Sequence, residues 1–597
     1  MRRAMALGTV VAAATVVATL ACSAGKPQNA DCSTCCLAAI CDGDDGGTSP
    51  NGGTGGASSA NGGTTPGGGG TIVIGGMSSG GASGMPSGGS AGSGPLRDPE
   101  TCEEAVKFRT YLGCEYFPTV LANVVYPDFD FAVVVANASD QAAALHVDGP
   151  NGFSTDASVE PHALATIFLP WVADLKGPNA DGSCNAGKMT GSVLARGSAY
   201  HLTSTRPVAA YQFSPLEFQA AGGPAGKTWA CDASAICTCN SYANDASLLL
   251  PKNALTPNYF AFTWRDTGAS STPSYVTVTA VEDATTVVVK VGASGSIQAG
   301  PTGSGIAAAG PGTVFTLNLD AGDVAELLAV PGTDLAGTQV QSVDTKPLQV
   351  MSGNAATRVP DAMTDSADHL EEIVFPAEAV GKNYVVTVPT GPRGVPVEHL
   401  VRLFGHAAES ALSYFPNKPS GAPDTLAPGT VAEFTATSDF EVLGTTPFGV
   451  GSFLVGGELL DPTTDPRDSM GDPSQSLVTS TVQYRDEYVF LAPVDYTKNY
   501  VDIVAPSGTA VTLDGSALDA SQAAALSGRA SDGTSPQTFD IYRQELGATK
   551  NGQHELSATA PVGIQVTGYG RFTSYQYPGG LNLNLVSDPP PLPPQPR

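Results

Sequence analysis

Short runs of β-branched and aromatic residues recur along residues 101–586, and polar turns separate them. Residues 131–135 form one such run, residues 137–140 form a polar turn, and residues 144–147 form the next run. β-Branched runs joined by short polar turns are typical of antiparallel hairpins. The pattern has no long stretch of helical period, and only residues 521–526 indicate a short helix. The chain is therefore predicted to be all-β.

A first repeated block contains a hydrophobic run, a proline, a spacer and an Asn-Tyr pair. Its copies are Leu248-Leu249-Leu250-Pro251 with Asn258-Tyr259, Val374-Phe375-Pro376 with Asn383-Tyr384, Leu491-Ala492-Pro493 with Asn499-Tyr500, and a divergent Tyr116-Phe117-Pro118. Repetition of this kind indicates one structural unit that is used several times.

A second repeated block reads Thr, a variable residue, Pro and then an alternating run. Its copies are Thr205-Arg206-Pro207, Thr345-Lys346-Pro347, Thr445-Thr446-Pro447 and Thr559-Ala560-Pro561. Proline is tolerated at the first residue of a strand, where its missing N–H costs no ladder hydrogen bond. The block is therefore predicted to be a turn that launches a strand.

The four copies of the second block predict four tandem modules, because their mean spacing is about 120 residues. A unit of that size with six or more short strands is typical of an antiparallel β-sandwich. The predicted bounds are 101–243, 244–367, 368–481 and 482–586.

The first 21 residues are typical of an export signal. Arg2 and Arg3 precede an apolar stretch, residues 4–21, that is too short for a comfortable membrane span. Thr19-Leu20-Ala21-Cys22 resembles a bacterial lipoprotein lipobox, although Thr19 stands where leucine is usual. We expect Cys22 to be a lipid anchor that holds the chain on the outer membrane or cell surface. The alternatives are the periplasmic face and, with an ordinary signal peptide, secretion.

Residues 22–45 contain a small cysteine cluster, and residues 46–100 are predicted to be a disordered tether. The cluster consists of Cys32, Cys35, Cys36 and Cys41. No histidine lies nearby, so two local disulfides are favoured over a zinc site in an exported chain. The tether is almost all small and polar, with many glycines, and cannot bury a core. Residues 587–597 are predicted to be an extended Pro-rich tail.

Six further cysteines all precede residue 240. They are Cys102, Cys114, Cys184, Cys231, Cys237 and Cys239. An even number in an exported chain predicts three disulfides in the first module, and their pairing stays open.

Acidic residues outnumber basic residues by 56 to 28, which gives a net charge of −28. Binding to phosphate requires clustered Lys and Arg, so nucleic acid is excluded as a partner. The expected partners are the membrane, through the lipid, and an unidentified extracellular protein or glycan.

Several stretches resemble the IgGFc-binding protein N-terminal domain family. They are residues 198–213, 244–251 and 337–354, together with Asp368-His369-Leu370-Glu371-Glu372 and the Pro376 and Gly381-Lys382 that follow. The resemblance extends over residues 114–384, and the second half is similar to the extension of related myxobacterial-type surface lipoproteins. It implies an extracellular, adhesive, all-β module without established catalysis.

Asp368 to Glu372 is the richest cluster of titratable residues, and it offers either an acid/base pair or a metal site. Neighbouring side chains in a strand point to opposite faces, which disfavours a shared metal. We therefore interpret the cluster as a solvated loop that leads into the third module. We expect no catalytic residue, metal or cofactor in the chain.

Aromatic residues near the C-terminus offer a contact surface. Phe572, Tyr575 and Tyr577 lie in a short stretch with two glycines, and exposed aromatic faces stack well on ligands. The alternative is a packed terminal strand. Trp171, Trp229 and Trp264 are further candidates for binding sugars.

These features favour a non-enzymatic binding or adhesion lipoprotein tethered to the cell surface. One alternative is a hydrolase of envelope or extracellular polymers that uses carboxylates near Asp368 and Glu371. A second alternative is a structural spacer in the envelope.

Overall fold

Strands dominate the computed structural model, which describes residues 97–267, 272–361, 363–364, 366–462, 469–530, 532–547 and 552–594. The described helices are α1 (Cys102–Phe108), α2 (Ala173–Lys176), α3 (Gly457–Leu460) and single 3-10 turns. The predicted all-β fold of antiparallel sheets is confirmed. The helix predicted at 521–526 is wrong, because the 3-10 turn η7 (Ala520–Gln522) runs into strand β29 (Ala524–Arg529).

The signal peptide, Cys22, the cluster from Cys32 to Cys41 and nearly all of the tether lie outside the described residues. Among the described residues, no helix has the length and apolar character needed to cross a bilayer.

The first sheet pair is built on one long strand, β7 (His201–Phe213), which belongs to both sheets. Its first half pairs with β1 (Gly113–Tyr116) and β3 (Ala143–Asp148), and β4 (Ser154–Val159) pairs with β3. Its second half pairs with β2 (Phe131–Asn137) and β8 (Ala246–Leu248), and β5 (Ala163–Leu169) pairs with β2.

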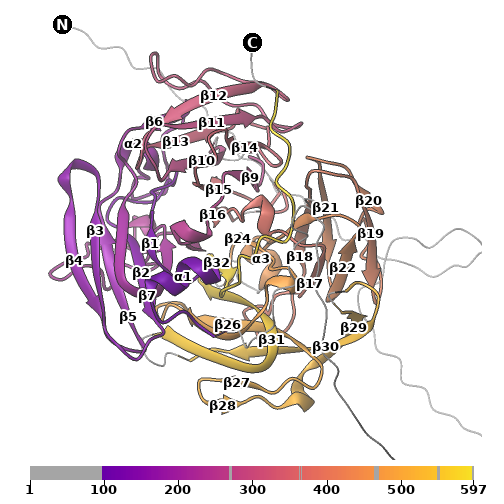
Figure 1. The fold of residues 1–597 in the computed structure, drawn as a ribbon. Coiled ribbons are helices and arrows are strands. Elements are labelled where there is room, and N and C mark those ends of the chain that lie inside the picture. Colours follow the sequence, from indigo (N-terminus) through magenta and orange to yellow (C-terminus); the bar gives the residue numbers. More distant parts are fainter. Residues whose placement is uncertain are drawn as a thin grey trace, which may run out of the picture. The chain divides into compact units, whose positions relative to one another are not determined.

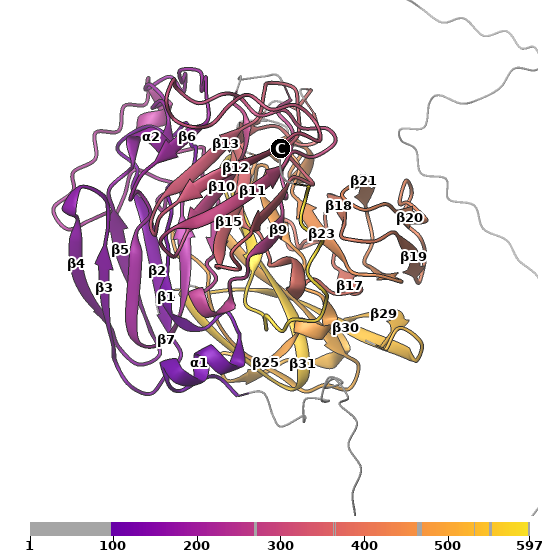
Figure 2. The same cartoon turned by 45° about the horizontal axis from the view of Figure 1, so that its top comes forward.

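The second module has two separate sheets. The first contains, in spatial order, β12 (Val314–Leu319), β11 (Thr285–Lys290), β14 (Gln339–Ser342) and β9 (Asn258–Phe260). The second contains β16 (Asp368–Ile373), β15 (Leu348–Thr357), β10 (Ser274–Ala280), β13 (Val324–Leu328) and β6 (Val193–Ala195). Strand β6 comes from the first module, so the two modules share a sheet (Figure 2).

The third module repeats this plan. One sheet contains β17 (Asn383–Val386), β22 (Phe440–Gly444), β19 (Ser410–Phe415) and β20 (Thr425–Leu426). The other contains β21 (Val431–Ala436), β18 (His399–Gly405), β23 (Phe448–Phe453) and β24 (Gln475–Leu477).

The fourth module returns to the plan of the first, with the long strand β31 (Gln553–Gly570) in both sheets. Its first half pairs with β25 (Arg485–Leu491) and β27 (Val511–Leu513), and β28 (Ser516–Ala517) pairs with β27. Its second half pairs with β26 (Lys498–Pro506) and β32 (Thr573–Pro578), while β30 (Pro536–Glu545) joins β26 to β29.

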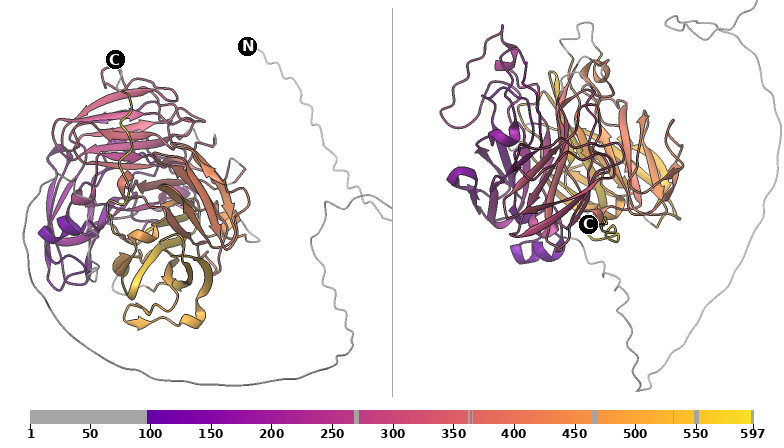
Figure 3. Two further views of the ribbon diagram at one scale, coloured as in Figure 1. Left: turned by 45° about the vertical axis from the view of Figure 1, so that its right-hand side comes forward. Right: turned by 90° about the horizontal axis from the view of Figure 1, so that it is seen from above.

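Each module ends in an edge strand that pairs with the module's own sheet. Strand β8 pairs with β7 and β16 pairs with β15, so the predicted boundaries at 243/244 and 367/368 fall one strand too early. A long hydrophobic cluster runs through all four modules, from Tyr111 through Trp264 and Phe453 to Tyr577. The described residues, from 97 onward, consequently form one compact unit rather than separate domains (Figure 3).

The second repeated block marks where the chain passes from one sheet to the other. In the second and third modules β15 and β23 begin directly after Pro347 and Pro447, as predicted. In the first and fourth modules Pro207 and Pro561 lie inside β7 and β31 instead. The hydroxyl groups of three of the block's threonines each accept a hydrogen bond from a backbone N–H at 3.0 Å. These bonds cap a neighbouring strand. The pairs are Thr205 with Ala144, Thr445 with Ala411 and Thr559 with Ala510.

A buried tyrosine connects the two repeated blocks in every module. Its hydroxyl donates to the carbonyl of the residue that follows the block's proline; the pairs are Tyr116 with Val208, Tyr259 with Leu348, Tyr384 with Phe448, and Tyr488 with Val562. The fourth copy of the first block therefore centres on Tyr488, and its assignment to Asn499-Tyr500 is wrong. Ser480 takes the place of the proline there, directly before a 3-10 turn, η6 (Thr481–Gln483).

Replacing Tyr384 by Phe should lower the free energy of unfolding by about 2 kcal/mol, the usual cost of leaving buried polar groups unpaired. The Tyr384 hydroxyl donates to the Phe448 carbonyl at 2.6 Å and accepts from the Gly381 N–H at 3.0 Å. Urea unfolding of the purified chain measures the change. Tyr126→Phe, on a half-buried ring, is the matched control and should shift the midpoint by less than a quarter as much. Equal shifts for both variants would contradict the role of the hydroxyl.

The C-terminal segment 579–594, here called the strap, touches every module (Figure 1, yellow). Leu583 donates to the Arg109 carbonyl, and Val586 donates to the Glu378 carbonyl. Further along, Gln341 and Gln339 donate to the carbonyls of Pro590 and Pro591, each at 2.9 Å. The predicted Pro-rich tail thus packs, as far as it is described, against residues 377–378 and against the second module.

Candidate functional site

The four edge strands β8, β16, β24 and β32 meet at the centre of the compact unit, each in contact with the next. Figure 1 labels β16, β24 and β32 there. Polar side chains join them there. Ser247 of β8 and Ser476 of β24 donate to the two carboxyl oxygens of Glu372 at 2.9 and 3.1 Å. Gln576 of β32 donates to the Ser474 carbonyl at 2.8 Å. The strands that close each repeat therefore build a shared polar centre.

Five carboxyl groups lie in this centre, and all five residues are buried: Asp245, Asp368, Glu371, Glu372 and Asp472. Burial raises the pKa of every one of them, to about 8 for Glu372. Repulsion from Asp368 raises the pKa of Asp472 further. The group is thus held largely as neutral acids, which avoids the cost of burying charge. Within the described part of the chain, no three His, Cys, Asp or Glu side chains are arranged so that they could hold a metal ion.

The predicted loop at Asp368–Glu372 is wrong, because these residues form the fully buried strand β16. A strand at the centre has protein on both faces, so its polar residues find partners inside rather than water. His369 Nε2 lies 3.3 Å from the nearer oxygen of Glu371, and burial lowers the pKa of His369 to about 3. This histidine is neutral and remote from solvent, which is a poor setting for an acid/base pair acting on a polymer.

The predicted aromatic contact surface does not form. Tyr575 and Tyr577 are fully buried in β32, and the Tyr575 hydroxyl donates to Asn499 at 2.7 Å. Only Phe572 is partly exposed, edge-on to the ring of Tyr242. Trp264 is also fully buried, with the guanidinium of Arg402 over its ring at 4.2 Å. The alternating pattern of the C-terminal stretch thus reflects a packed strand.

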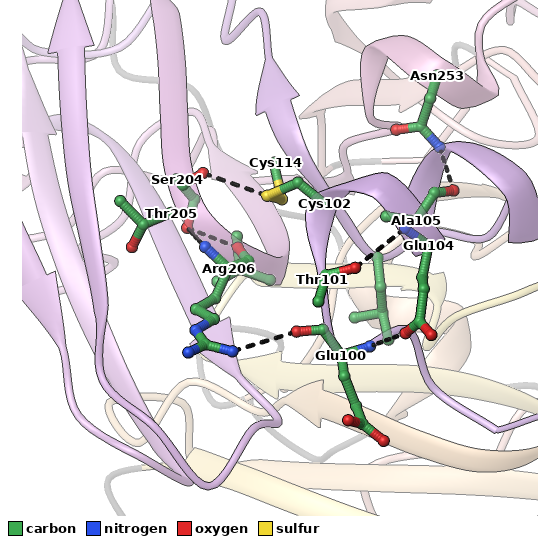
Figure 4. Close-up of a disulfide and its surroundings, with 12 residues drawn as sticks. Glu100, Thr101, Cys102, Glu104, Ala105, Cys114, Ser204, Thr205, Arg206 and Asn253 are labelled. Carbon is green, nitrogen blue, oxygen red and sulfur yellow. Dashed lines mark hydrogen bonds between the residues drawn. A yellow bond between two sulfur atoms is a disulfide. The ribbon is translucent and has the colours of Figure 1, made fainter.

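The six cysteines of the first module form three disulfides, as predicted. The pairs are Cys102–Cys114, Cys184–Cys237 and Cys231–Cys239. The first joins α1 to β1 (Figure 4), where the Thr101 hydroxyl caps the helix by accepting from the Glu104 N–H at 3.2 Å. The carbonyl of Ala105 in α1 accepts from the Asn253 side chain at 2.8 Å, which holds the helix against the start of the second module. This disulfide fixes the N-terminal end of the body.

The other two disulfides lock two long loops, residues 177–192 and 214–245, at one end of the first module. Cys184–Cys237 joins the loops, and the Cys237 N–H donates to the Gly182 carbonyl at 3.2 Å. Asp181 accepts from the amides of Ser183 and Asn185, and these bonds lower its pKa. Long loops fixed on a rigid scaffold are the usual carriers of binding function.

A cavity of about 350 Å³, here called the loop cavity, opens beside the first of these loops, residues 177–192. Its walls come from α2, residues 177–193 of the first module, and residues 299–301 and β13 of the second. Gly191 allows the two modules to approach, because a Cβ there would lie 2.7 Å from the Ala299 carbonyl oxygen.

Glu326 lines the loop cavity and is 1% exposed. Its Oε1 accepts from the Ala122 N–H at 2.9 Å and from the Thr277 hydroxyl at 3.5 Å, and burial raises its pKa to about 8. A role for Glu326 was not predicted from the sequence. Its only signal is a single acidic residue inside the apolar run Val324–Leu328.

Among the solved structures that resemble the chain, one weak match is titled "Crystal structure of tetra-tandem repeat in extending region of large adhesion protein". It is 11% identical, covers 79% of this chain and 100% of the other, and has a TM-score of 0.08. No curated protein matches the chain.

A family model described as IgGFc binding protein matches residues 245–568, more than half of the 597-residue chain. The match begins at the edge strand of the first module and extends to the end of β31, which carries the resemblance seen in the sequence well into the fourth module. Together with the three disulfides, it indicates an exported or extracellular protein. The chain belongs to the IgGFc binding protein family.

Proposed function

We propose that the chain is a non-enzymatic binding protein that displays a rigid four-module body outside the cell. Its membership of the IgGFc binding protein family carries the proposal. The buried centre supports it, since the titratable residues that offered catalysis are closed off from solvent. The partner is an extracellular protein or a glycan, and the binding surface is the pair of disulfide-locked loops of the first module.

We further propose that Cys22 is lipidated and that residues 46–100 hold the body away from the membrane. A flexible chain of about 50 residues spans roughly 35–42 Å, which is enough reach for contact with a neighbouring surface. Protease added to intact producing cells should remove the body from wild-type cells, and Cys22→Ala should release it into the medium. Protection of the body in intact cells would place it in the periplasm and reject display.

A direct test uses the full chain carrying Cys22→Ala, fluorescently labelled and mixed with whole cells and extracellular matrix. Saturable binding is expected, and removing the loop disulfide with Cys184→Ser and Cys237→Ser should weaken it at least tenfold. The same double variant should keep its far-UV circular dichroism, because both cysteines lie in loops outside the strands of the sheets. Absence of saturable binding to any fraction would reject a binding function. Turnover of polysaccharide or peptide substrates by the purified chain would favour the hydrolase instead.

A further inference from the structure

The loop cavity combines an apolar wall with an acidic end. Leu175, Met189, Val193 and Leu328 contribute to the wall. Leu175, Met189 and Leu328 are buried, while Asp174 is exposed at the rim. Glu326 supplies the buried carboxyl group. Such a cavity offers separate places for an aliphatic chain and for a polar head.

One oxygen of Glu326 remains available for a ligand. Both hydrogen bonds that the described residues make to this side chain, from Ala122 and Thr277, fall on Oε1. The second oxygen, Oε2, makes no hydrogen bond to the described residues and is not one of the fully buried atoms, so a donor that enters the cavity can reach it. Its preferred partner is a donor that also compensates the charge of the ionised acid.

We propose that the loop cavity binds an aliphatic primary amine, which in a partner protein is the side chain of a lysine. The inference rests on the proposed function and names the chemistry of the surface that the partner would present. The ammonium group donates to Glu326, and the methylene chain lies along Leu175, Met189 and Leu328. Lysine side chains commonly bury their stems against apolar surface in this way. The volume of the cavity, about 350 Å³, falls within the usual range for small-ligand sites.

The other charged and titratable groups near Glu326 fit this assignment. Asp174 at the rim adds negative charge at the mouth. Lys188 lies at the same mouth but is exposed, where water and salt screen its charge. Tyr275 lies on the neighbouring strand β10, opposite Leu328. Its pKa is raised mainly by burial, with smaller contributions from Glu371 and Glu326, so it stays neutral.

The test titrates Nα-acetyl-L-lysine methylamide into the full chain carrying Cys22→Ala and follows binding by calorimetry. The norleucine analogue, which lacks the amine, and the Nε-acetylated analogue should bind at least tenfold more weakly. Binding of the lysine probe should tighten about tenfold from pH 6 to pH 8, because Glu326 must lose its proton to pair with the ammonium. Equal binding of the three probes, or binding of a neutral sugar alone, would overturn the assignment.

Two variants separate the site from the fold. Glu326→Gln keeps an oxygen that accepts from the Ala122 N–H, and it should lower the affinity for the lysine probe at least tenfold. Thr190→Trp adds a ring at an exposed position of the mouth and should block the probe without touching the core. Glu160→Gln removes one exposed acidic charge elsewhere and should change nothing. Undiminished probe binding by both cavity variants would reject the site. Undiminished cell binding by Glu326→Gln would reject this inference while the proposed function stands.

Discussion

Raising the pH from 7 to 9 should lower the thermal unfolding midpoint of the chain by about 5 °C or more. The five buried acids of the centre have folded-state pKa values above their ordinary values, so their contribution to stability is full below about pH 4 and is lost as the pH rises through the folded-state values. For Glu372 that value is about 8. A shift of one pKa unit corresponds to about 1.4 kcal/mol, so Glu372 alone loses about that much over this interval. The raised pKa values of the other four acids change stability in the same direction.

The interval from pH 7 to pH 9 isolates these acids from the buried histidines. Burial lowers the pKa of His369 and of His399 to about 3. A base with a lowered folded-state pKa gains stability as the pH rises to its unfolded value of about 6.5, so this opposite effect is complete by pH 7. Differential scanning calorimetry at several pH values measures the result.

Glu372→Gln should flatten the pH dependence, because the amide stays neutral and still accepts from Ser247 or Ser476. The exposed Glu160→Gln is the matched control and should leave the dependence unchanged. A wild-type chain that is as stable at pH 9 as at pH 7 would show that the centre is not held as neutral acids.

The repeated architecture could be predicted because its signals are local. In Thr-x-Pro, one proline and one hydroxyl mark where the chain passes from one sheet to the other. In the runs on either side, apolar and polar residues alternate with the period of a strand. The number of disulfides could be predicted from the even number of cysteines, but their pairing depends on which loops meet in space. The fourth tyrosine was misplaced because Ser480 replaces the proline and Glu487 replaces the asparagine that mark the second and third copies, and these two changes removed the signal.

The centre could not be predicted because it joins residues far apart in the sequence. β8 contacts β32, more than 300 residues later, and only this closure buries Asp368 and Glu371. An acidic stretch on its own indicates a solvent-exposed segment, since charged residues are almost never buried without partners. The prediction that Tyr575 and Tyr577 form an exposed surface was wrong for the same reason, because the closure buries both faces of β32. The contact between strands that are far apart in the sequence therefore decides which polar residues are buried in the core.

Replacing Asn582 of the strap by Ala should lower the free energy of unfolding by about 3 kcal/mol, the cost of leaving a buried charged donor unpaired. Arg485 is 1% exposed in its side chain and donates to Asn582 Oδ1 at 2.6 Å. The Asn582 side-chain amide donates in turn to the Tyr484 carbonyl at 2.9 Å. Urea unfolding of the full chain measures the loss.

Asn584, two residues further along the strap, is the matched control because its residue is exposed and its strap contacts are made by the backbone. Asn584→Ala should change the unfolding free energy by less than about 0.5 kcal/mol. A loss confined to Asn582→Ala would mean that the strap stabilises the body through one buried arginine, which also pairs with Asp98 ahead of α1. The first and last described segments of the body would then depend on the same side chain, so unfolding of either end should expose the other. Equal effects of the two variants would instead assign the strap's contribution to its backbone hydrogen bonds.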